Sequence, residues 1–135
     1  MKVSEPFTGH LGYIWSLLKF DNITILSGGQ DTSIKVWTTK GEEKHSLREH
    51  QNSIHCIQKM SDDTFISGPR DQNIIVWKNY QAVNRIKIHT AIVLSLCRIT
   101  DNTFASGSGD NVINITNLEG TILQTLAGHP TGFGR

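Results

Sequence analysis

The stretches SGGQDTSIKVW (27–37), SGPRDQNIIVW (67–77) and SGSGDNVINIT (106–116) decide the fold, because they are three copies of one pattern. Each copy begins with Ser-Gly, carries an aspartate four residues after the serine, and ends six residues after that aspartate. A histidine precedes each aspartate at the same spacing, and His10, His50 and His89 recur at two intervals that differ by a single residue. A period of about 40 residues is typical of proteins built from stacked or radially arranged repeats.

Each repeat contains four short segments that favour β-strands, separated by residues that favour turns. The segments are 13–20, 23–28, 33–37 and 43–47 in the first repeat, 53–60, 64–68, 73–77 and 82–88 in the second, and 92–99, 103–107, 112–116 and 121–126 in the third. Nothing between them has a 3.6-residue hydrophobic period long enough for a helix. The sequence therefore predicts an all-β fold in which each repeat is a four-stranded antiparallel blade of a β-propeller.

With these residues in register, the chain resembles the WD40 repeat family, whose units are about 40–45 residues long and open with Gly-His and close with Trp-Asp. The first repeat opens with Gly9-His10, whereas Glu49 and Ile88 replace the glycine in the other two; the closing pairs are Trp37-Thr38 and Trp77-Lys78. We assign residues 1–135 to a WD40 repeat region, with repeats at about 9–48, 49–87 and 88–127 and a truncated fourth from 128. The resemblance implies a partial propeller of three blades.

The resemblance also implies a hydrogen-bonded chain of four side chains in each repeat. In that chain the aspartate caps the turn between the second and third strands and fixes the histidine tautomer. The histidine reaches a serine hydroxyl, which accepts the tryptophan indole N–H, so the indole is buried without an unpaired donor. Thr116 ends the third chain early, and we expect that blade to be the least stable. The residues are His10, Ser27, Asp31 and Trp37; His50, Ser67, Asp71 and Trp77; and His89, Ser106 and Asp110.

A histidine, a serine and an aspartate together also occur in hydrolases. A catalytic triad occurs once in an enzyme, however, and this trio occurs three times at the same spacing, with no serine in a Gly-x-Ser-x-Gly turn. His45, His50 and His55 have no cysteine or carboxylate at ligand spacing, which argues against a metal site. We therefore predict no catalytic residue, no metal and no cofactor, and we expect the chain not to be an enzyme.

The composition and the absence of long apolar segments indicate which kinds of partner and which cellular location to expect. The net charge of +1 provides no field that would attract nucleic acid, which is therefore an unlikely partner. No segment approaches the roughly 20 apolar residues of a membrane span, and none resembles a signal peptide, so we expect a cytoplasmic or alternatively nuclear protein without a membrane partner. Cys56 and Cys97 lie in equivalent first strands, and we expect both to be small core residues without a disulfide.

For a propeller of this family, the resemblance places binding on one face, at the positions three and five after each histidine and one before each aspartate. Transferred to this sequence, these are Tyr13, Trp15 and Gln30; Ser53, His55 and Arg70; and Ile92, Leu94 and Gly109. Tyrosine, tryptophan and arginine are enriched at protein-binding hot spots, so we predict binding by the first two sets. Two alternatives stay open: Trp15 packs against a neighbouring blade, and Arg70 is a solubilising charge.

The sequence thus predicts a non-catalytic scaffold that binds other proteins or peptides. One alternative is a regulatory piece of a multidomain enzyme such as a kinase or ubiquitin ligase, and another is a reader of ubiquitin or modified peptides. Because closed propellers have about 4–8 blades, we expect the chain to belong to a longer propeller. Otherwise it self-associates through open blade faces, or it is a degenerate product that folds poorly.

Overall fold

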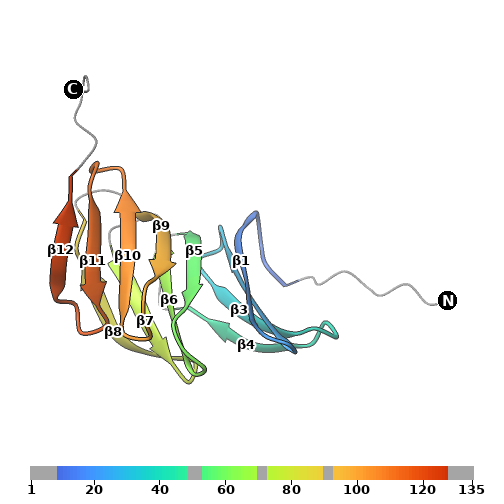
Figure 1. Cartoon of the computed structure of the whole chain (residues 1–135). Helices are drawn as coiled ribbons and strands as arrows, with labels where there is room; N and C mark the ends of the chain where they lie inside the picture. The colour runs from blue at the N-terminus through green and yellow to red at the C-terminus, as the bar shows by residue number, and fades with distance from the viewer. Residues whose placement is uncertain (1–8, 49–52, 70–72, 90–92, 128–135) are drawn as a thin grey trace.

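The computed structural model describes residues 9–48, 53–69, 73–89 and 93–127, and the strands in these ranges form three four-stranded sheets (Figure 1). Blade 1 consists of β1 (Ile14–Asp21), β2 (Thr24–Gly29), β3 (Ile34–Thr38) and β4 (Glu43–Leu47). Blade 2 consists of β5 (Ile54–Lys59), β6 (Thr64–Pro69), β7 (Asn73–Lys78) and β8 (Gln81–Lys87). Blade 3 consists of β9 (Val93–Arg98), β10 (Thr103–Ser108), β11 (Ile113–Asn117) and β12 (Ile122–Leu126).

Within each sheet the strands pair antiparallel in the order of the sequence. The prediction of an all-β fold built from four-stranded blades is confirmed, and the observed strands begin and end close to the predicted segments. None of the described residues forms a helix long and apolar enough to cross a membrane. The start of a fourth repeat from residue 128 lies outside the described residues.

The blades stand side by side, with their first strands adjacent and their fourth strands at the opposite edge (Figure 1). Strand β5 lies between β1 and β9, so these three strands line the inner edge of an arc. Successive blades are therefore related as neighbouring blades of a propeller are, and equivalent residues of the repeats occupy equivalent places along the arc.

A tighter hairpin in blade 2 explains why the interval from His50 to His89 is one residue shorter than the interval from His10 to His50. Asn79 and Tyr80, which join β7 to β8, both have positive φ angles, 52° and 64°, as a two-residue type I′ turn requires. The ladder pairs Trp77 with Ala82, whereas in blade 1 it pairs Trp37 with Glu43, one residue further along the chain. The one-residue difference thus lies in a turn, where it does not change the face of the sheet to which each strand residue points.

The hydrophobic core lies between the blades. One cluster joins blades 1 and 2, and a second joins blades 2 and 3. The first comprises Phe20, Leu26, Ile34, Val36, Ile54, Ile57, Phe65, Ile75 and Trp77, and the second Met60, Ile66, Ile74, Val76, Ile86, Val93 and Phe104. Each blade therefore owes its buried apolar surface to its neighbours, as expected for a repeat protein.

The two cysteines differ in their surroundings, and the prediction that both are core residues is wrong for Cys97. Cys56 is half-buried between blades, where burial raises the pKa of its thiol to about 12. Cys97 is exposed, because its side of blade 3 has no described blade packed against it. Both are free thiols.

Candidate functional site

In blade 1 the four residues expected to be linked form a continuous series of hydrogen bonds. The His10 Nδ1 atom lies 3.0 Å from Oδ1 of Asp31, and its Nε2 atom lies 2.6 Å from the Ser27 hydroxyl. The Trp37 indole N–H donates to the same hydroxyl oxygen over 2.8 Å. With the Nδ1 proton donated to the carboxylate, Nε2 accepts the serine proton, so one neutral tautomer satisfies every member.

Asp31 is held ionised by backbone and side-chain hydrogen-bond donors. Burial opposes this charge, but the Leu11 amide, His10 and Ser33 all donate hydrogen bonds to the carboxylate and hold the pKa of Asp31 well below its ordinary value. The Leu11 N–H bond is 2.9 Å long and the Ser33 hydroxyl bond is 2.8 Å long. The carboxylate therefore ties the segment before β1 to the turn between β2 and β3.

The other two blades contain parts of the same series. In blade 2 the Trp77 indole donates to Ser67 over 2.8 Å, while His50 and Asp71 lie outside the described residues. In blade 3 the His89 ring lies 3.0 Å from Asp110 and 2.7 Å from the Ser106 hydroxyl. The hydroxyl of Thr116 is buried there and has no hydrogen-bond partner among the described residues.

These serines resemble the nucleophile of a hydrolase only in their neighbours. The side chains of Ser27 and Ser106 belong to residues that are only 2% and 1% exposed. A nucleophile must reach its substrate, and these hydroxyls are enclosed between strands. In the described parts of the chain, no group of three or more histidine, cysteine or acidic side chains is placed to hold a metal ion.

Three of the residues predicted to bind proteins come together where β1 meets β5. Trp15 stacks on His55 with ring centroids 5.3 Å apart and planes inclined by 20°. Tyr13 meets Trp15 edge-on at 5.5 Å. Tyr13 and Trp15 remain 68% and 46% exposed, so this aromatic cluster spans two blades and still faces solvent. Trp15 thus both packs on the neighbouring blade and remains accessible.

Of the remaining predicted binding residues, Gln30 contacts the cluster, two lie elsewhere in the described ranges, and the others are not described. The Gln30 side-chain oxygen accepts the backbone amide proton of Tyr13 over 3.2 Å. The backbone N–H of Gln30 donates to the backbone carbonyl of Tyr13 over 2.8 Å. Ser53 is half-buried just before β5, and Gly109 is exposed in the turn after β10. Arg70 and Ile92 lie outside the described residues, and the side chain of Leu94 is not described either.

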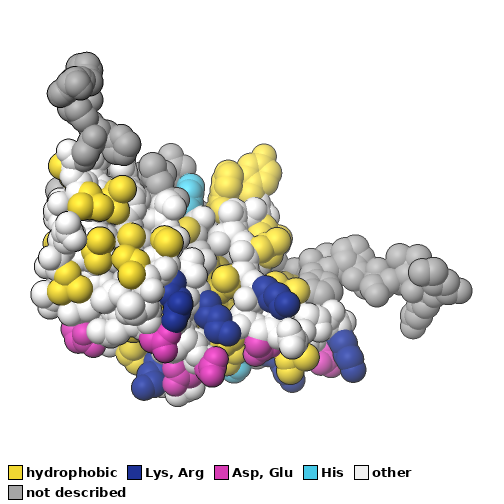
Figure 2. Space-filling model, in the orientation of Figure 1, with side chains coloured by type: hydrophobic (Ala, Val, Ile, Leu, Met, Phe, Trp, Pro, Cys, Tyr) yellow, Lys and Arg dark blue, Asp and Glu magenta, His cyan; other side chains and the backbone are white. Residues whose placement is uncertain are grey.

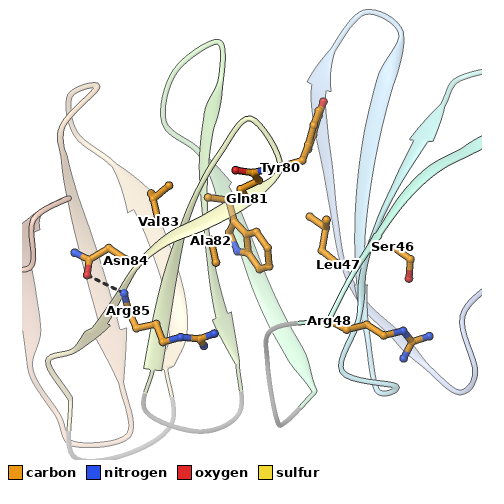
Figure 3. A pocket seen from close by; sticks show the side chains of 10 residues that line it. Ser46, Leu47, Arg48, Tyr80, Gln81, Ala82, Val83, Asn84 and Arg85 are labelled. Carbon is orange, nitrogen blue, oxygen red and sulfur yellow. Dashed lines mark hydrogen bonds between the residues drawn. The ribbon is translucent and has the colours of Figure 1, made fainter.

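Sequence reasoning missed a groove of about 670 Å³ between the fourth strands of blades 1 and 2 (Figure 3). Figure 3 shows Arg48, directly after β4, and Arg85, on β8, toward the same end of the groove. The two arginines are not equivalent positions of the repeat, so no repeated signal marks the groove in the sequence. Its lining is Ser46, Leu47, Arg48, Trp77, Tyr80, Gln81, Ala82, Val83, Asn84 and Arg85.

Comparison with known proteins places these features in one family. The sequence model of the WD domain, G-beta repeat family matches residues 1–38 and 41–78, more than half of the chain. A ribosome biogenesis protein WDR12 homolog of Drosophila mojavensis is 30% identical over 115 residues, covering 77% of this chain and 27% of that protein. The ubiquitin homeostasis protein lub1 of Schizosaccharomyces pombe is 36% identical over 94 residues, covering 69% and 13%.

A solved structure agrees with these relatives. The WD40 β-propeller domain of Doa1 superposes with a TM-score of 0.81 at 29% identity, covering 91% of this chain and 42% of that chain. This chain spans about a quarter of the length of the WDR12 homolog that it matches. The matched sequence model and the three repeated blades show that the chain belongs to the WD40, or G-beta repeat, family.

Proposed function

We propose that this chain is a non-catalytic scaffold that binds a protein or peptide at the aromatic cluster of Tyr13, Trp15 and His55, with Gln30, Ser53 and Arg70 as further contact residues. The observation that carries the proposal is the half-exposed Trp15 ring held against His55 of the next blade. Large aromatic side chains at a surface expose apolar area to water. Burying that area against a partner is favourable and contributes to the free energy of binding.

The cluster is also fixed in place before any partner arrives. Stacking holds Trp15, and the paired hydrogen bonds between Gln30 and Tyr13 hold the start of β1 against the β2–β3 turn. A surface whose side chains are already ordered loses less conformational entropy on binding. The enclosed hydroxyls of Ser27 and Ser106 support the non-catalytic part of the proposal.

A ubiquitin reader is the second candidate function, and the similarity to lub1, a protein named for ubiquitin homeostasis, favours it. Free ubiquitin is therefore the first purified probe for the aromatic cluster. The WDR12 homolog is named for ribosome biogenesis, and for this reason we place the nuclear alternative ahead of a cytoplasmic location.

Affinity capture with the wild-type chain and with Trp15→Ala tests the scaffold function. We expect at least one protein to be retained by the wild type and lost with Trp15→Ala, since removing a hot-spot aromatic costs about 2 kcal/mol or more. Val83→Ala is the matched control, because Val83 is also an exposed apolar residue and lies on the outer strand β8. Thermal melts establish that both variants are folded.

Two results separate the candidate functions. Chemical-shift changes in ubiquitin on titration with the wild-type chain, absent on titration with Trp15→Ala, would support the reader function. If the two variants capture the same proteins as the wild type, the aromatic cluster is not the binding surface and the proposal fails.

A further inference from the structure

The two outer faces of the arc expose apolar residues that are buried wherever a neighbouring blade is present. On the side of blade 1 turned away from blade 2, here called the blade 1 face, Ile14 and Leu17 are 50% and 70% exposed. Their equivalents in the second repeat, Ile54 and Ile57, are 0% and 8% exposed. On the opposite side of blade 3, the blade 3 face, hydrophobic side chains gather over β9–β12 (Figure 2).

At each joint between described blades, a side chain of the following blade fills the space above a glycine. A Cβ atom added to Gly28 would lie 2.6 Å from Cγ2 of Ile54. One added to Gly68 would lie 3.1 Å from Cγ1 of Val93. Gly107 is the equivalent glycine of blade 3, and no described atom lies within 4 Å of the same point. Among the described residues, the blade 3 face therefore has the glycine without a side chain that covers it.

A cation crosses each joint as well. The Lys59 ammonium group donates to the backbone carbonyl of Phe20 over 2.6 Å and lies 4.9 Å from the centre of its ring. One blade further on, Nε of Arg98 donates to the backbone carbonyl of Met60 over 2.8 Å. By the repeat interval, Lys19 is the equivalent donor on the blade 1 face and is exposed on β1. The equivalent acceptor on the blade 3 face is the carbonyl of Ile99, which follows β9.

We propose that the blade 1 face of one molecule packs on the blade 3 face of a second copy of this chain. In this contact Ile14 covers Gly107, and Lys19 donates to the carbonyl of Ile99, as Ile54 and Lys59 do inside the molecule. Leu17 occupies the place that Ile57 takes in the first joint. The proposal concerns the outer faces of the arc and is independent of the aromatic cluster.

A second copy is the occupant because the chain itself carries both halves of the joint in the required register. Any other partner must present an apolar side chain and a cation at the spacing of Ile14 and Lys19. Two copies joined twice place their six described blades in one ring, within the range of about 4–8 blades found in propellers. Both joints are then identical and related by a two-fold axis, so the assembly closes and covers both outer faces of the described arc.

Sedimentation equilibrium of the wild-type chain and of two single variants tests the proposal. We expect the wild type to have twice the mass of one chain. Ile14→Asp places a charge on the blade 1 face, and Gly107→Val fills the space above the glycine. Both positions are open in the single molecule, so each variant should fold. Each joint of the ring needs one blade 1 face and one blade 3 face. A variant that has lost either face should therefore be monomeric on its own.

Mixing the two variants is the decisive measurement. Ile14→Asp retains an intact blade 3 face and Gly107→Val retains an intact blade 1 face, so the mixture should form a heterodimer through one joint. Lys19→Ala should weaken the wild-type dimer about tenfold or more, because a hydrogen bond from a charged donor is lost. Val83→Asp, a charge on the outer strand β8, should leave the dimer unchanged.

Four results would overturn the proposal. A wild-type chain that stays monomeric at the highest soluble concentration means that the faces do not fit each other. Variants that self-associate alone, or that fail to associate when mixed while circular dichroism shows both folded, exclude the contact between blades 1 and 3. A mass that keeps growing with concentration excludes the closed ring of two copies.

Discussion

Ser27 shows how much of this fold depends on single hydroxyl groups. Its oxygen accepts the Trp37 indole proton while its own proton faces His10, so one small residue satisfies two larger ones. Neither large side chain has to leave a polar atom unpaired inside the blade. In a repeat that lacks one member of the series, we expect the residue that replaces it to destabilise the folded state.

Thr116 is that residue in blade 3, and its hydroxyl is buried without a partner among the described residues. We predict that Thr116→Val raises the free energy of unfolding by about 1 kcal/mol, since valine has nearly the same shape and no polar atom to desolvate. Urea melts followed by circular dichroism measure the change. Thr121→Val, an exposed change of the same kind, should stay within about 0.5 kcal/mol of wild type.

Asp31 makes the molecule sensitive to acid. Its pKa in the folded state is lowered, so the stability it provides is complete above the unfolded pKa of about 3.9 and is lost as the pH falls below it. We predict that Asp31→Asn lowers the free energy of unfolding by about 1–3 kcal/mol at neutral pH. The difference from wild type should shrink as the pH falls below about 4.

Urea melts of the two proteins across this pH range check the prediction. Asp62→Asn removes an exposed carboxylate from the turn between β5 and β6 and serves as the control. If the Asp31→Asn difference is the same in acid as at neutral pH, the charge of Asp31 contributes nothing to the blade.

At the scale of strands and hairpins, the sequence was sufficient because the signals are local. Alternating apolar residues and turn residues located all the strands of the described ranges, including those of the β7–β8 hairpin whose tight turn shortens the second repeat. Packing of Trp15 on a neighbouring blade was an alternative that the sequence left open, but its contact with His55 was not predicted, since it depends on how β1 meets β5. The groove beside Arg48 and Arg85 could not be predicted for the same reason, because it forms only where segments of two different repeats pack together.

Lys59 is a further residue whose role is visible only when two blades are packed. By composition it is an ordinary surface lysine, but its ammonium group binds the Phe20 carbonyl across the joint. We predict that Lys59→Ala lowers the free energy of unfolding by about 1.5–3 kcal/mol, the range for a hydrogen bond to a charged group. Lys19→Ala is the matched control on the preceding blade. Measured at concentrations where the chain is monomeric, it should change the stability little.

At the scale of the molecule, stability depends on how many blade faces are covered. The two described cores each need two blades, so the outer blades have one core apiece while blade 2 has two. Unfolding is therefore expected to begin at blades 1 and 3 and to reach blade 2 last.

Association of the outer faces predicts a melting temperature that depends on protein concentration, because dimerisation stabilises the folded state by mass action. We expect the Tm of the wild type to rise over a hundredfold range of concentration, and the Tm of Gly107→Val to stay constant. Scanning calorimetry at several concentrations provides both curves. A constant wild-type Tm would show that folding and association are not linked.

The three tryptophans provide a way to follow these events in time. The indole protons of Trp37 and Trp77 are enclosed in bonds to Ser27 and Ser67, whereas Trp15 is half-exposed. Hydrogen exchange of an enclosed proton requires local opening of its surroundings, so each of the two signals reports how often one blade opens. The order in which blades 1 and 2 come apart can therefore be measured from two side-chain protons without adding any label.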